Sequence, residues 1–287
     1  MTLTGGASAM FSWSTNLTLD DIHASGSTTD PLLEVESNHS DWSQSLTIRN
    51  SSFTDATTAI SGAGIHVSAD FGHHAITIDG TTIADNTSTG GTGGLRLYDA
   101  SSVTITDSLI SGNSGNTGGG GAWFGFDVGS VVVTSTTVDG NSTTYGWGGG
   151  LYANSDSFVM VDSTVSNNVA SACGGGGLEF DSDATVATVS NSTITGNSGV
   201  GGGGIRLEAI ESLTVNQSTI TGNASTGTDA DQGGGILMYS SGYLFLSGTI
   251  VAGNTAGDAT RADLATRDAS AVTVASDSRW ETSRGRP

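Results

Sequence analysis

Residues 187–197 read ATVSNSTITGN, and residues 213–223 read LTVNQSTITGN. The first eight residues of each stretch follow one template, with apolar residues at its first, third and eighth positions. Six more copies begin at residues 46, 76, 103, 131, 158 and 244. An asparagine follows three residues after the eighth position in seven copies, and Ala56 takes that place in the copy beginning at Leu46. A template that returns every 26 to 31 residues predicts a solenoid of stacked coils.

A glycine run followed by alternating apolar residues precedes most copies of the template. It reads GIHV at 64–67, GLRL at 94–97, GLYA at 150–153, GLEF at 177–180, GIRL at 204–207 and GILM at 235–238. The segment GAWF at 121–124 fits this pattern less well. Alternation with a period of two indicates strands, and the repeats show no helical period of 3.6. Each unit therefore holds a strand, a bend, a second strand, a shorter third strand and a glycine-rich turn.

These units predict an all-β fold, a right-handed parallel β-helix of about eight coils of about 28 residues with three short strands per coil. Coils that stack about 4.8 Å apart bury their apolar positions in one shared interior. The asparagines are expected to form a ladder of side-chain amides along the axis. The glycines are expected to provide the positive φ angles of the sharp turns.

Composition sets limits on the partners of the chain. Its 287 residues carry 28 acidic and 8 basic side chains, no lysine, and a formal charge of −20. This charge excludes nucleic acid and disfavours an anionic membrane surface, and no apolar run reaches the roughly 20 residues that span a bilayer. The single Cys173 excludes an internal disulfide and a cysteine zinc cluster. We expect a monomer that does not span a membrane.

The repeats divide the chain into three parts. Residues 1–45 are predicted to form an atypical N-terminal coil or cap, residues 46–257 the β-helix repeats, and residues 258–287 an irregular C-terminal tail that holds five of the eight arginines. Residues 1–20 lack the basic-then-apolar order of a secretory signal. The large apolar residues Leu, Ile, Val and Phe make up only about 21% of the sequence, so folding depends on their placement at the repeated positions.

The strings NSTITGN at 191–197, QSTITGN at 217–223 and GTIVAGNTA at 248–256 carry a resemblance to a known group. They resemble bacterial right-handed β-helix repeat proteins of the polymorphic outer-membrane-protein type, which are secreted and anchored at the surface. The resemblance covers residues 46–256. It implies an extracellular or cell-surface location and an adhesin-like role. It implies no catalytic residues, because that group shares no catalytic motif.

The outward positions of the glycine-led strands bring together the residues of a candidate site. Their order predicts that carboxylates and an arginine from neighbouring coils lie one or two strand spacings apart: Glu179, Asp181, Arg206 and Glu208. Aromatic side chains from the same strands and the adjoining turns are predicted to line a ligand-binding groove: Tyr98, Trp123, Phe124, Phe126, Trp147 and Tyr152. Aromatic rings beside carboxylates and arginine are typical of saccharide sites.

This arrangement leaves three interpretations open. Two of the carboxylates could act as acid and base or nucleophile in glycoside cleavage, or Arg206 could neutralise a uronate in a lyase. The face could bind glycans without turnover. The carboxylates could also simply pair with Arg206 across the strands, which needs no function. We expect an exported, adhesin-like surface protein with a glycan-contacting face, and a polysaccharide lyase or glycoside hydrolase is the alternative.

The sequence predicts no cofactor and no dedicated metal centre. Weak Ca²⁺ binding is a possibility, since oxygen ligands in loops suit that ion and several aspartates lie in predicted turns: Asp99, Asp127, Asp156, Asp181, Asp183, Asp229 and Asp231. The glycine-rich nonapeptide of calcium-binding β-rolls is missing. A flat threonine column that could contact ice is interrupted by Val132, Val159 and Phe245.

Overall fold

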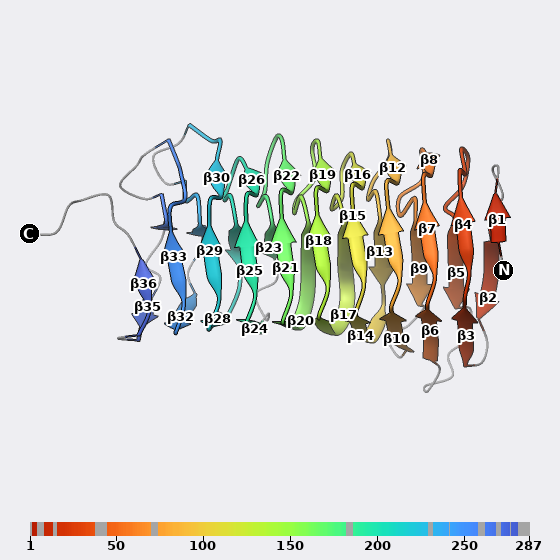
Figure 1. Ribbon diagram of the computed structural model, residues 1–287, viewed down its shortest axis with the longest axis horizontal. Coiled ribbons are helices and arrows are strands. Elements are labelled where there is room, and N and C mark those ends of the chain that lie inside the picture. Colours follow the sequence, from red (N-terminus) through yellow and green to blue (C-terminus); the bar gives the residue numbers. More distant parts are fainter. Residues whose placement is uncertain are drawn as a thin grey trace, which may run out of the picture.

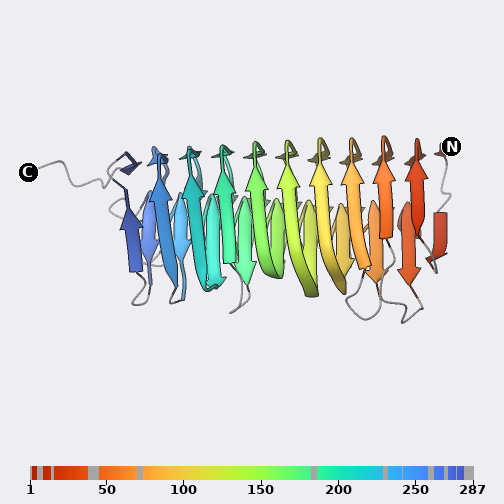
Figure 2. The same ribbon diagram turned by 90° about the horizontal axis from the view of Figure 1, so that it is seen from below.

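The structure is a computed structural model. It describes residues 2–4, 9–13, 16–37, 45–69, 74–181, 186–228, 232–240, 242–257, 262–267, 271–275 and 277–280. These residues form strands and turns without a helix, and the strands pair in parallel throughout. The chain winds into an elongated rod with β1 (Thr2–Thr4) at one end and β36 (Arg279–Trp280) at the other (Figures 1 and 2). The described part therefore confirms the predicted parallel β-helix.

The largest of three sheets, called the broad sheet here, takes two strand positions from each coil. The glycine-led position holds β2 (Ala9–Trp13), β5 (Leu33–Ser37), β9 (Ile65–Ala69), β13 (Leu95–Tyr98), β23 (Leu178–Asp181), β27 (Ile205–Ala209), β31 (Ile236–Met238) and β34 (Leu264–Thr266). The template position holds β3 (Leu17–Asp20), β6 (Ser45–Arg49), β10 (His74–Asp79), β14 (Ala100–Thr106), β24 (Val186–Ser190), β28 (Ser212–Asn216), β32 (Tyr243–Ser247) and β35 (Ala271–Val274). In two central coils one long strand covers both positions: β17 (Ala122–Thr134) and β20 (Leu151–Val161).

Two smaller sheets complete each coil. The middle sheet begins at β1, ends at β36, and between them holds β4 (His23–Ser25), β7 (Ser52–Thr54), β11 (Thr82–Ala84), β15 (Leu109–Ser111), β18 (Thr137–Asp139), β21 (Thr164–Ser166), β25 (Thr193–Thr195), β29 (Thr219–Thr221) and β33 (Ile250–Ala252). The short sheet has two-residue strands after the asparagine: β8 (Thr57–Thr58), β12 (Thr87–Ser88), β16 (Ser114–Gly115), β19 (Ser142–Thr143), β22 (Val169–Ala170), β26 (Ser198–Gly199) and β30 (Ala224–Ser225).

The structure has three sheets, as three predicted strands per coil require, but the predicted strands do not each correspond to one sheet. The two strands predicted on either side of the bend join in the broad sheet, as the pairing of β17 with both β13 and β14 shows. The third predicted strand forms the middle sheet. The strands of the short sheet were not expected, because two residues are too few to show an alternating pattern.

Strand register aligns equivalent template positions in columns. Val131 faces Val103 in the preceding coil and Phe158 in the next, and all three side chains are fully buried. The eighth positions align in the same way, from Phe53 through Ile83 onward in the middle sheet. Each coil contributes a few apolar side chains to a narrow core that is continuous along the rod. This arrangement explains how a sequence poor in large apolar residues can fold.

The predicted asparagine ladder is present and its amides are fully hydrogen-bonded. Asn141 donates one Nδ2 hydrogen to Oδ1 of Asn168 (2.9 Å) and the other to the carbonyl of Ile110 (2.9 Å). Its own Oδ1 accepts hydrogen bonds from Nδ2 (2.9 Å) and the backbone N–H (3.0 Å) of Asn113. The amide-to-amide bonds repeat from Asn86 to Asn254. At the first of them, Oδ1 of Asn86 accepts the backbone N–H of Ala56 (3.1 Å), which has no side-chain amide to add. A buried amide that uses both donors and both lone pairs avoids the cost of unpaired polar groups.

Strand pairing and the ladder continue into the terminal parts of the chain. Strands β3, β4 and β5 pair with β6, β7 and β9, and strands β34, β35 and β36 pair with β31, β32 and β33. At the C-terminal side Asn254 donates its Nδ2 (2.9 Å) and its backbone N–H (3.0 Å) to Oδ1 of Asp263. A buried carboxylate oxygen thus takes the place of the next amide oxygen.

A second ladder lies at the sixth template position, which always carries a hydroxyl in the eight copies. Ser163 Oγ donates to the carbonyl of Val161 (2.7 Å) and accepts from the backbone N–H of Thr136 (3.1 Å) in the preceding coil. Ser192 repeats both bonds one coil further on. We did not predict this ladder, although the repeated Ser or Thr was visible in the sequence.

The glycine runs serve mainly to leave space. A Cβ at Gly150 would lie 2.6 Å from the carbonyl oxygen of Gly177 and 3.1 Å from the side-chain amide of Asn168. The expected positive φ is found at the start of the run, at Gly148 (φ 70°), but not at Gly149 or Gly150. Those glycines are required because the chain passes directly against the asparagine ladder and the next coil.

The described residues were compared with the requirements for a membrane-spanning helix. No helix among them has the length and hydropathy to cross a bilayer.

Replacing Asn141 by alanine should break the ladder. The change leaves the backbone N–H and Nδ2 of Asn113 and the carbonyl of Ile110 without partners, which should lower the free energy of unfolding by about 3–5 kcal/mol. Equilibrium unfolding in urea measures the change. Asn116→Ala is the control, because the Asn116 amide donates to the carbonyl of Thr89 at an exposed position and its loss should cost less than about 1 kcal/mol. Equal losses in the two variants would refute this account of the ladder.

Candidate functional site

The outward residues of the glycine-led strands form one column across the coils. The pairing register aligns Glu34, His66, Arg96, Trp123, Tyr152, Glu179 and Arg206 in this order. The structure therefore brings together the carboxylates, the arginines and the aromatic rings that the sequence placed on this face. At Glu179 the turns through Gly148 and Gly175 contact the column.

Phe124 is a correction to the predicted ligand-binding set. It pairs with Leu97 in the preceding coil, so its side chain points inward, and it is fully buried in the core. Trp123 takes the outward position instead, opposite Arg96 and Tyr152. The alternation starts at Ala122, whose small side chain fills an inward position, and this made the register hard to read from the sequence.

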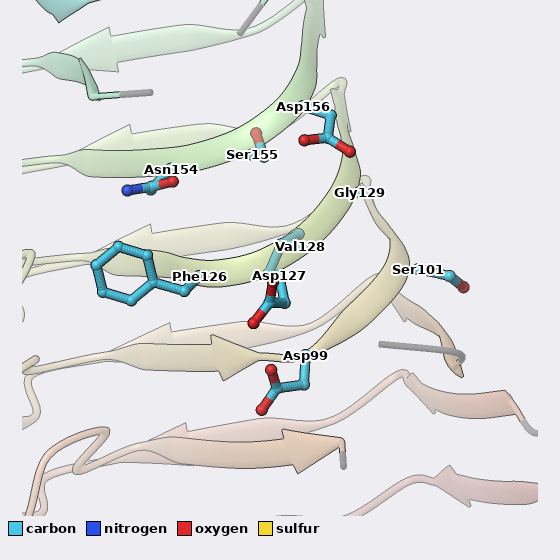
Figure 3. A pocket seen from close by; sticks show the side chains of 9 residues that line it. All are labelled: Asp99, Ser101, Phe126, Asp127, Val128, Gly129, Asn154, Ser155 and Asp156. Atoms are coloured by element: carbon cyan, nitrogen blue, oxygen red, sulfur yellow. The ribbon is translucent and has the colours of Figure 1, made fainter. Parts of the chain in front are cut away.

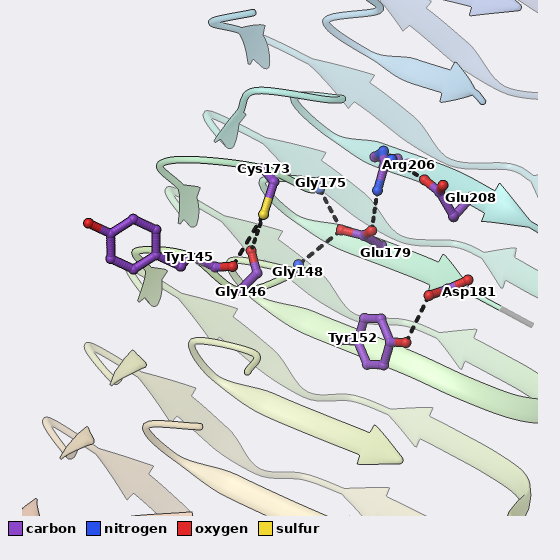
Figure 4. A network of polar contacts seen from close by, with 10 residues as sticks. All are labelled: Tyr145, Gly146, Gly148, Tyr152, Cys173, Gly175, Glu179, Asp181, Arg206 and Glu208. Carbon is purple, nitrogen blue, oxygen red and sulfur yellow. Dashed lines mark hydrogen bonds and ion pairs between the residues drawn. The ribbon is translucent and has the colours of Figure 1, made fainter. Parts of the chain in front are cut away.

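Glu179 lies at the centre of a buried polar network (Figure 4). Its side chain has no exposed surface. Oε2 accepts hydrogen bonds from the backbone N–H of Gly148 (3.1 Å) and of Gly175 (2.7 Å), and Oε1 is paired with the Arg206 guanidinium. Glu179 therefore joins the turns of two coils to a third coil through a single carboxylate.

Burial raises the pKa of Glu179 to about 7, against an ordinary value of 4.5. The Arg206 cation and the Gly175 N–H oppose this shift by stabilising the ionised form, and the negative charge of Glu208 adds to it. Two carboxylates share one guanidinium here, because the other side of Arg206 is paired with Glu208. The cluster has one more acid than base, and this adds a little to the effect of burial, which is the main cause of the raised pKa.

The remaining contacts of Arg206 leave little of it open to a ligand. Its side chain is 11% exposed, and its guanidinium lies over the ring of Tyr239 at 4.8 Å from the centroid. Both terminal nitrogens of this guanidinium already contact carboxylates, so neither of its paired N–H edges is fully free for a uronate. Glu179 likewise has both oxygens occupied. The geometry favours a structural role for Glu179 and Arg206.

The predicted aromatic residues form a chain of ring contacts. Tyr98 meets Trp123 edge to face at 4.7 Å, and Trp123 stacks on Tyr152 at 5.9 Å. Trp147 lies beyond Tyr152 at 6.0 Å and is 44% exposed. The hydroxyl of Tyr152 donates to Oδ2 of Asp181 (3.0 Å), and burial raises the pKa of this buried phenol. Asp181 is therefore tied to the aromatic chain rather than to Arg206.

The turn that carries Trp147 is held from the next coil. Gly148 is bound to Glu179, and the thiol of Cys173 lies 3.3 Å from the carbonyl oxygen of Tyr145 and 3.4 Å from that of Gly146. Burial raises the pKa of the Cys173 thiol, which keeps it in the neutral form that can donate. These contacts fix the backbone from which Tyr145 and Trp147 project.

A hollow of about 580 Å³ opens beside the aromatic chain, where β17 and β20 bend between their two strand positions (Figure 3). Phe126, another predicted ligand-binding residue, lies in it with 62% of its surface exposed. Polar side chains from three consecutive coils surround it: Asp99, Ser101, Asp127, Asn154, Ser155 and Asp156. Its volume lies within the range of about 300–1,000 Å³ that is usual for small-ligand sites.

The acids of the hollow were predicted as turn residues but not as a group with Phe126. Asp99, Asp127 and Asn154 each lie four residues before the first template position of their coil, and this shared spacing was a usable signal. Asp99 and Asp127 have positive φ angles of 54° and 61°. In the described part of the chain, no three carboxylate, histidine or cysteine side chains gather closely enough to hold a metal ion. The candidate calcium residues Asp183, Asp229 and Asp231 lie outside the described residues.

The raised pKa of Glu179 predicts a specific pH dependence. Because the folded protein holds this proton more tightly than the unfolded chain, the resulting stabilisation is complete below pH 4.5 and is lost as the pH rises through about 7. Glu179→Gln should remove this component, so the fall in stability between those pH values should be smaller in the variant. Urea unfolding at several pH values measures it. Glu211→Gln, on the exposed surface outside the network, is the control, and parallel profiles for wild type and Glu179→Gln would contradict the prediction.

Comparison with known proteins identifies the fold family. A family model described as the right-handed β-helix region matches residues 42–256, which is most of the chain and includes every residue of the polar network, the aromatic chain and the hollow. Among curated proteins and solved structures, none matches the chain significantly. The matched residues that the structure describes lie within its parallel coils. The chain therefore belongs to the right-handed β-helix family.

Proposed function

We propose that this protein is a carbohydrate-contacting β-helix that acts outside the cell and binds neutral saccharides in the hollow around Phe126. The observation that carries the proposal is the combination of an exposed aromatic ring with carboxylate and amide side chains from three coils in one concave site. The right-handed β-helix family supplies the rigid scaffold on which such a site can be built.

Phe126 provides the apolar part of the proposed site. Its ring is 62% exposed, although an exposed phenylalanine loses the free energy that burial would give it. A sugar ring presents C–H groups on one face, which can cover an aromatic ring and restore that apolar contact. The close-up view shows the ring extending from β17 alongside Asn154 (Figure 3).

The surrounding polar groups determine the class of saccharide. Carboxylates accept hydrogen bonds from sugar hydroxyls, and such charge-assisted bonds are stronger than neutral ones. Asp127 and Asp156 are exposed in the hollow, and Asp99 is half-buried beside them. Three acids at one site repel an acidic sugar, and the whole chain adds to this with its charge of −20. We therefore infer a preference for neutral saccharides.

The proposed extracellular location rests on the sequence. The repeats resemble surface-anchored β-helix proteins of the polymorphic outer-membrane-protein type, and glycans are common partners at cell surfaces. A strongly acidic, lysine-free surface keeps a rod-like molecule soluble and separate from its copies. An adhesin-like role agrees with a site that lies on the side of the rod rather than at its ends.

The enzyme alternative depends on residues that are already occupied. Glu179 is enclosed, Arg206 contacts Glu179 and Glu208, and Asp181 is bonded to Tyr152. Cleavage at the polar network would need at least one of these carboxylates to reach a substrate. Binding without turnover is the function that this geometry supports best.

Phe126→Ala tests the proposed site. Loss of the ring should weaken retention by neutral polysaccharides such as laminarin or galactomannan about threefold to tenfold, which corresponds to the usual contribution of an aromatic contact. Affinity gel electrophoresis measures this effect. Phe245→Ala is the matched control, because Phe245 is also exposed (41%) but lies on β32, outside the hollow. Equal retention of wild type and Phe126→Ala would contradict the proposal.

Asp127→Asn tests the charge selectivity. Asparagine tolerates the positive φ of this position, so the backbone should be kept while one repelling charge is removed. Retention by the acidic polysaccharide alginate should increase in this variant, whereas retention by neutral polysaccharides should change less than about threefold. A decrease in alginate retention would contradict the repulsion argument.

Incubation with the same polysaccharides separates binding from catalysis. We expect no new reducing ends and no absorbance from unsaturated uronates, because the carboxylates of the network are enclosed or paired. Turnover that disappears in Glu208→Gln would establish the enzyme instead. Glu208 is the informative choice, because it is the most exposed of the three charged groups in that network, at 31%.

A further inference from the structure

Arg96, on β13, is one of the two arginines of the outward column. Its guanidinium carbon lies 4.4 Å from the centroid of Tyr98 and 4.9 Å from that of Trp123, in the corner formed by two rings that meet edge to face. Such contacts attract the cation to the rings but do not use its N–H groups. The position is separate from the hollow, and the inference below does not rest on the proposed function.

Arg96 has no carboxylate partner among the described residues. Two other arginines do have carboxylate partners: Arg49 pairs with Asp20 at 3.0 Å, and Arg206 pairs with Glu179 and Glu208. The Nε of Arg96 is shielded from solvent and has no hydrogen-bond acceptor in the described structure. Burial without a countercharge lowers the pKa of Arg96. A half-buried cation in this state is unusual in a chain that carries 28 acids.

The residues on either side of Arg96 in the column share this lack of partners. In the next coil, the indole N–H of Trp123 is shielded and has no acceptor within the described residues. In the preceding coil, Nδ1 of His66 is also shielded without a hydrogen bond, since Oε1 of Glu34 lies 3.7 Å away. Three consecutive coils thus place unsatisfied nitrogen atoms on the same side of the sheet, at intervals of about 4.8 Å.

We propose that Arg96 and Trp123 bind a carboxylate group of a ligand. The two oxygens of a carboxylate can accept hydrogen bonds from the edge of the guanidinium and from the indole N–H one coil away. This pairing supplies the acceptors that Nε of Arg96 and Nε1 of Trp123 lack, and it places a negative charge against the unpaired cation. The rings of Tyr98 and Trp123 lie beside the guanidinium of this ion pair.

The charge of the site favours a monoanion over phosphate. Arg96 provides one positive charge, and His66 adds none at neutral pH, because burial and the neighbouring Arg96 lower its pKa to about 4. A phosphate dianion would therefore keep an uncompensated charge in the field of a protein whose net charge is −20.

Titration calorimetry on the full chain tests the proposal with defined probes. Benzoate represents a free carboxylate and glucuronate a carboxylated sugar, with benzyl alcohol (the uncharged counterpart of benzoate) and inorganic phosphate as comparisons. We expect wild type to bind at least one carboxylate probe, and to bind benzyl alcohol and phosphate at least about tenfold more weakly. Arg96→Gln should reduce carboxylate binding by at least about tenfold. Arg49→Gln, which removes an exposed arginine already paired with Asp20, should leave carboxylate binding unchanged.

The outcomes separate the possible sources of the ligand group. Similar binding of benzoate and glucuronate assigns the site to carboxylates in general, and binding of glucuronate alone assigns it to carboxylated sugars. A second measurement guards against misfolding: the bound probe should raise the thermal midpoint of wild type and of Arg49→Gln, but not that of Arg96→Gln. The proposal is overturned if wild type binds neither carboxylate, if phosphate binds as tightly, or if Arg96→Gln binds them like wild type.

The proposed carboxylate site at Arg96 and the proposed saccharide site at Phe126 can be refuted independently. Loss of neutral polysaccharide binding in Phe126→Ala concerns the hollow alone, whereas the calorimetric probes report on Arg96. Retention of neutral polysaccharides by Arg96→Gln, together with loss of carboxylate binding, would establish two distinct contact points on one face of the rod.

Discussion

The asparagine ladder is the constraint on which the rest of the structure depends. Each amide is bonded to the coil before and the coil after, so neighbouring coils can stack in one register only. The adjoining glycines follow from it, because a side chain at Gly150 or Gly177 would collide with the ladder or with the next coil. Once this interior line is fixed, parallel pairing carries the same register to all three sheets.

A fixed register makes the outer surface a set of independent columns. The inward residues must be apolar and similar from coil to coil, whereas the outward residues are free to vary. This freedom explains how one column can hold Arg96, Trp123, Tyr152 and Glu179 in successive coils. The charged and aromatic side chains that could contact a ligand lie in that column and in the adjoining turns, whereas the core consists of apolar side chains.

The turns decide which outward groups remain accessible. Glu179 belongs to the outward column, yet the turns through Gly148 and Gly175 cover it and bind its carboxylate. It has thereby become part of the support for the turn that carries Trp147. At the bend of β17 and β20, by contrast, the described residues form a hollow with an exposed Phe126. The accessible chemistry lies at this bend and at Arg96, and not at the buried carboxylate.

The sequence by itself determined the repeat, the parallel stacking, the core columns and the asparagine ladder, because these depend on short-range patterns that every coil repeats. It also placed Glu179, Arg206 and the aromatic residues on one face. The short sheet and the inward position of Phe124 escaped it, since two-residue strands and a register that starts at a small Ala122 leave no clear alternation. Only the tertiary structure decided which of the aligned groups are covered, paired or open. That outcome depends on the path of each turn over its neighbouring coil, and the turns are the part of the sequence in which the coils differ.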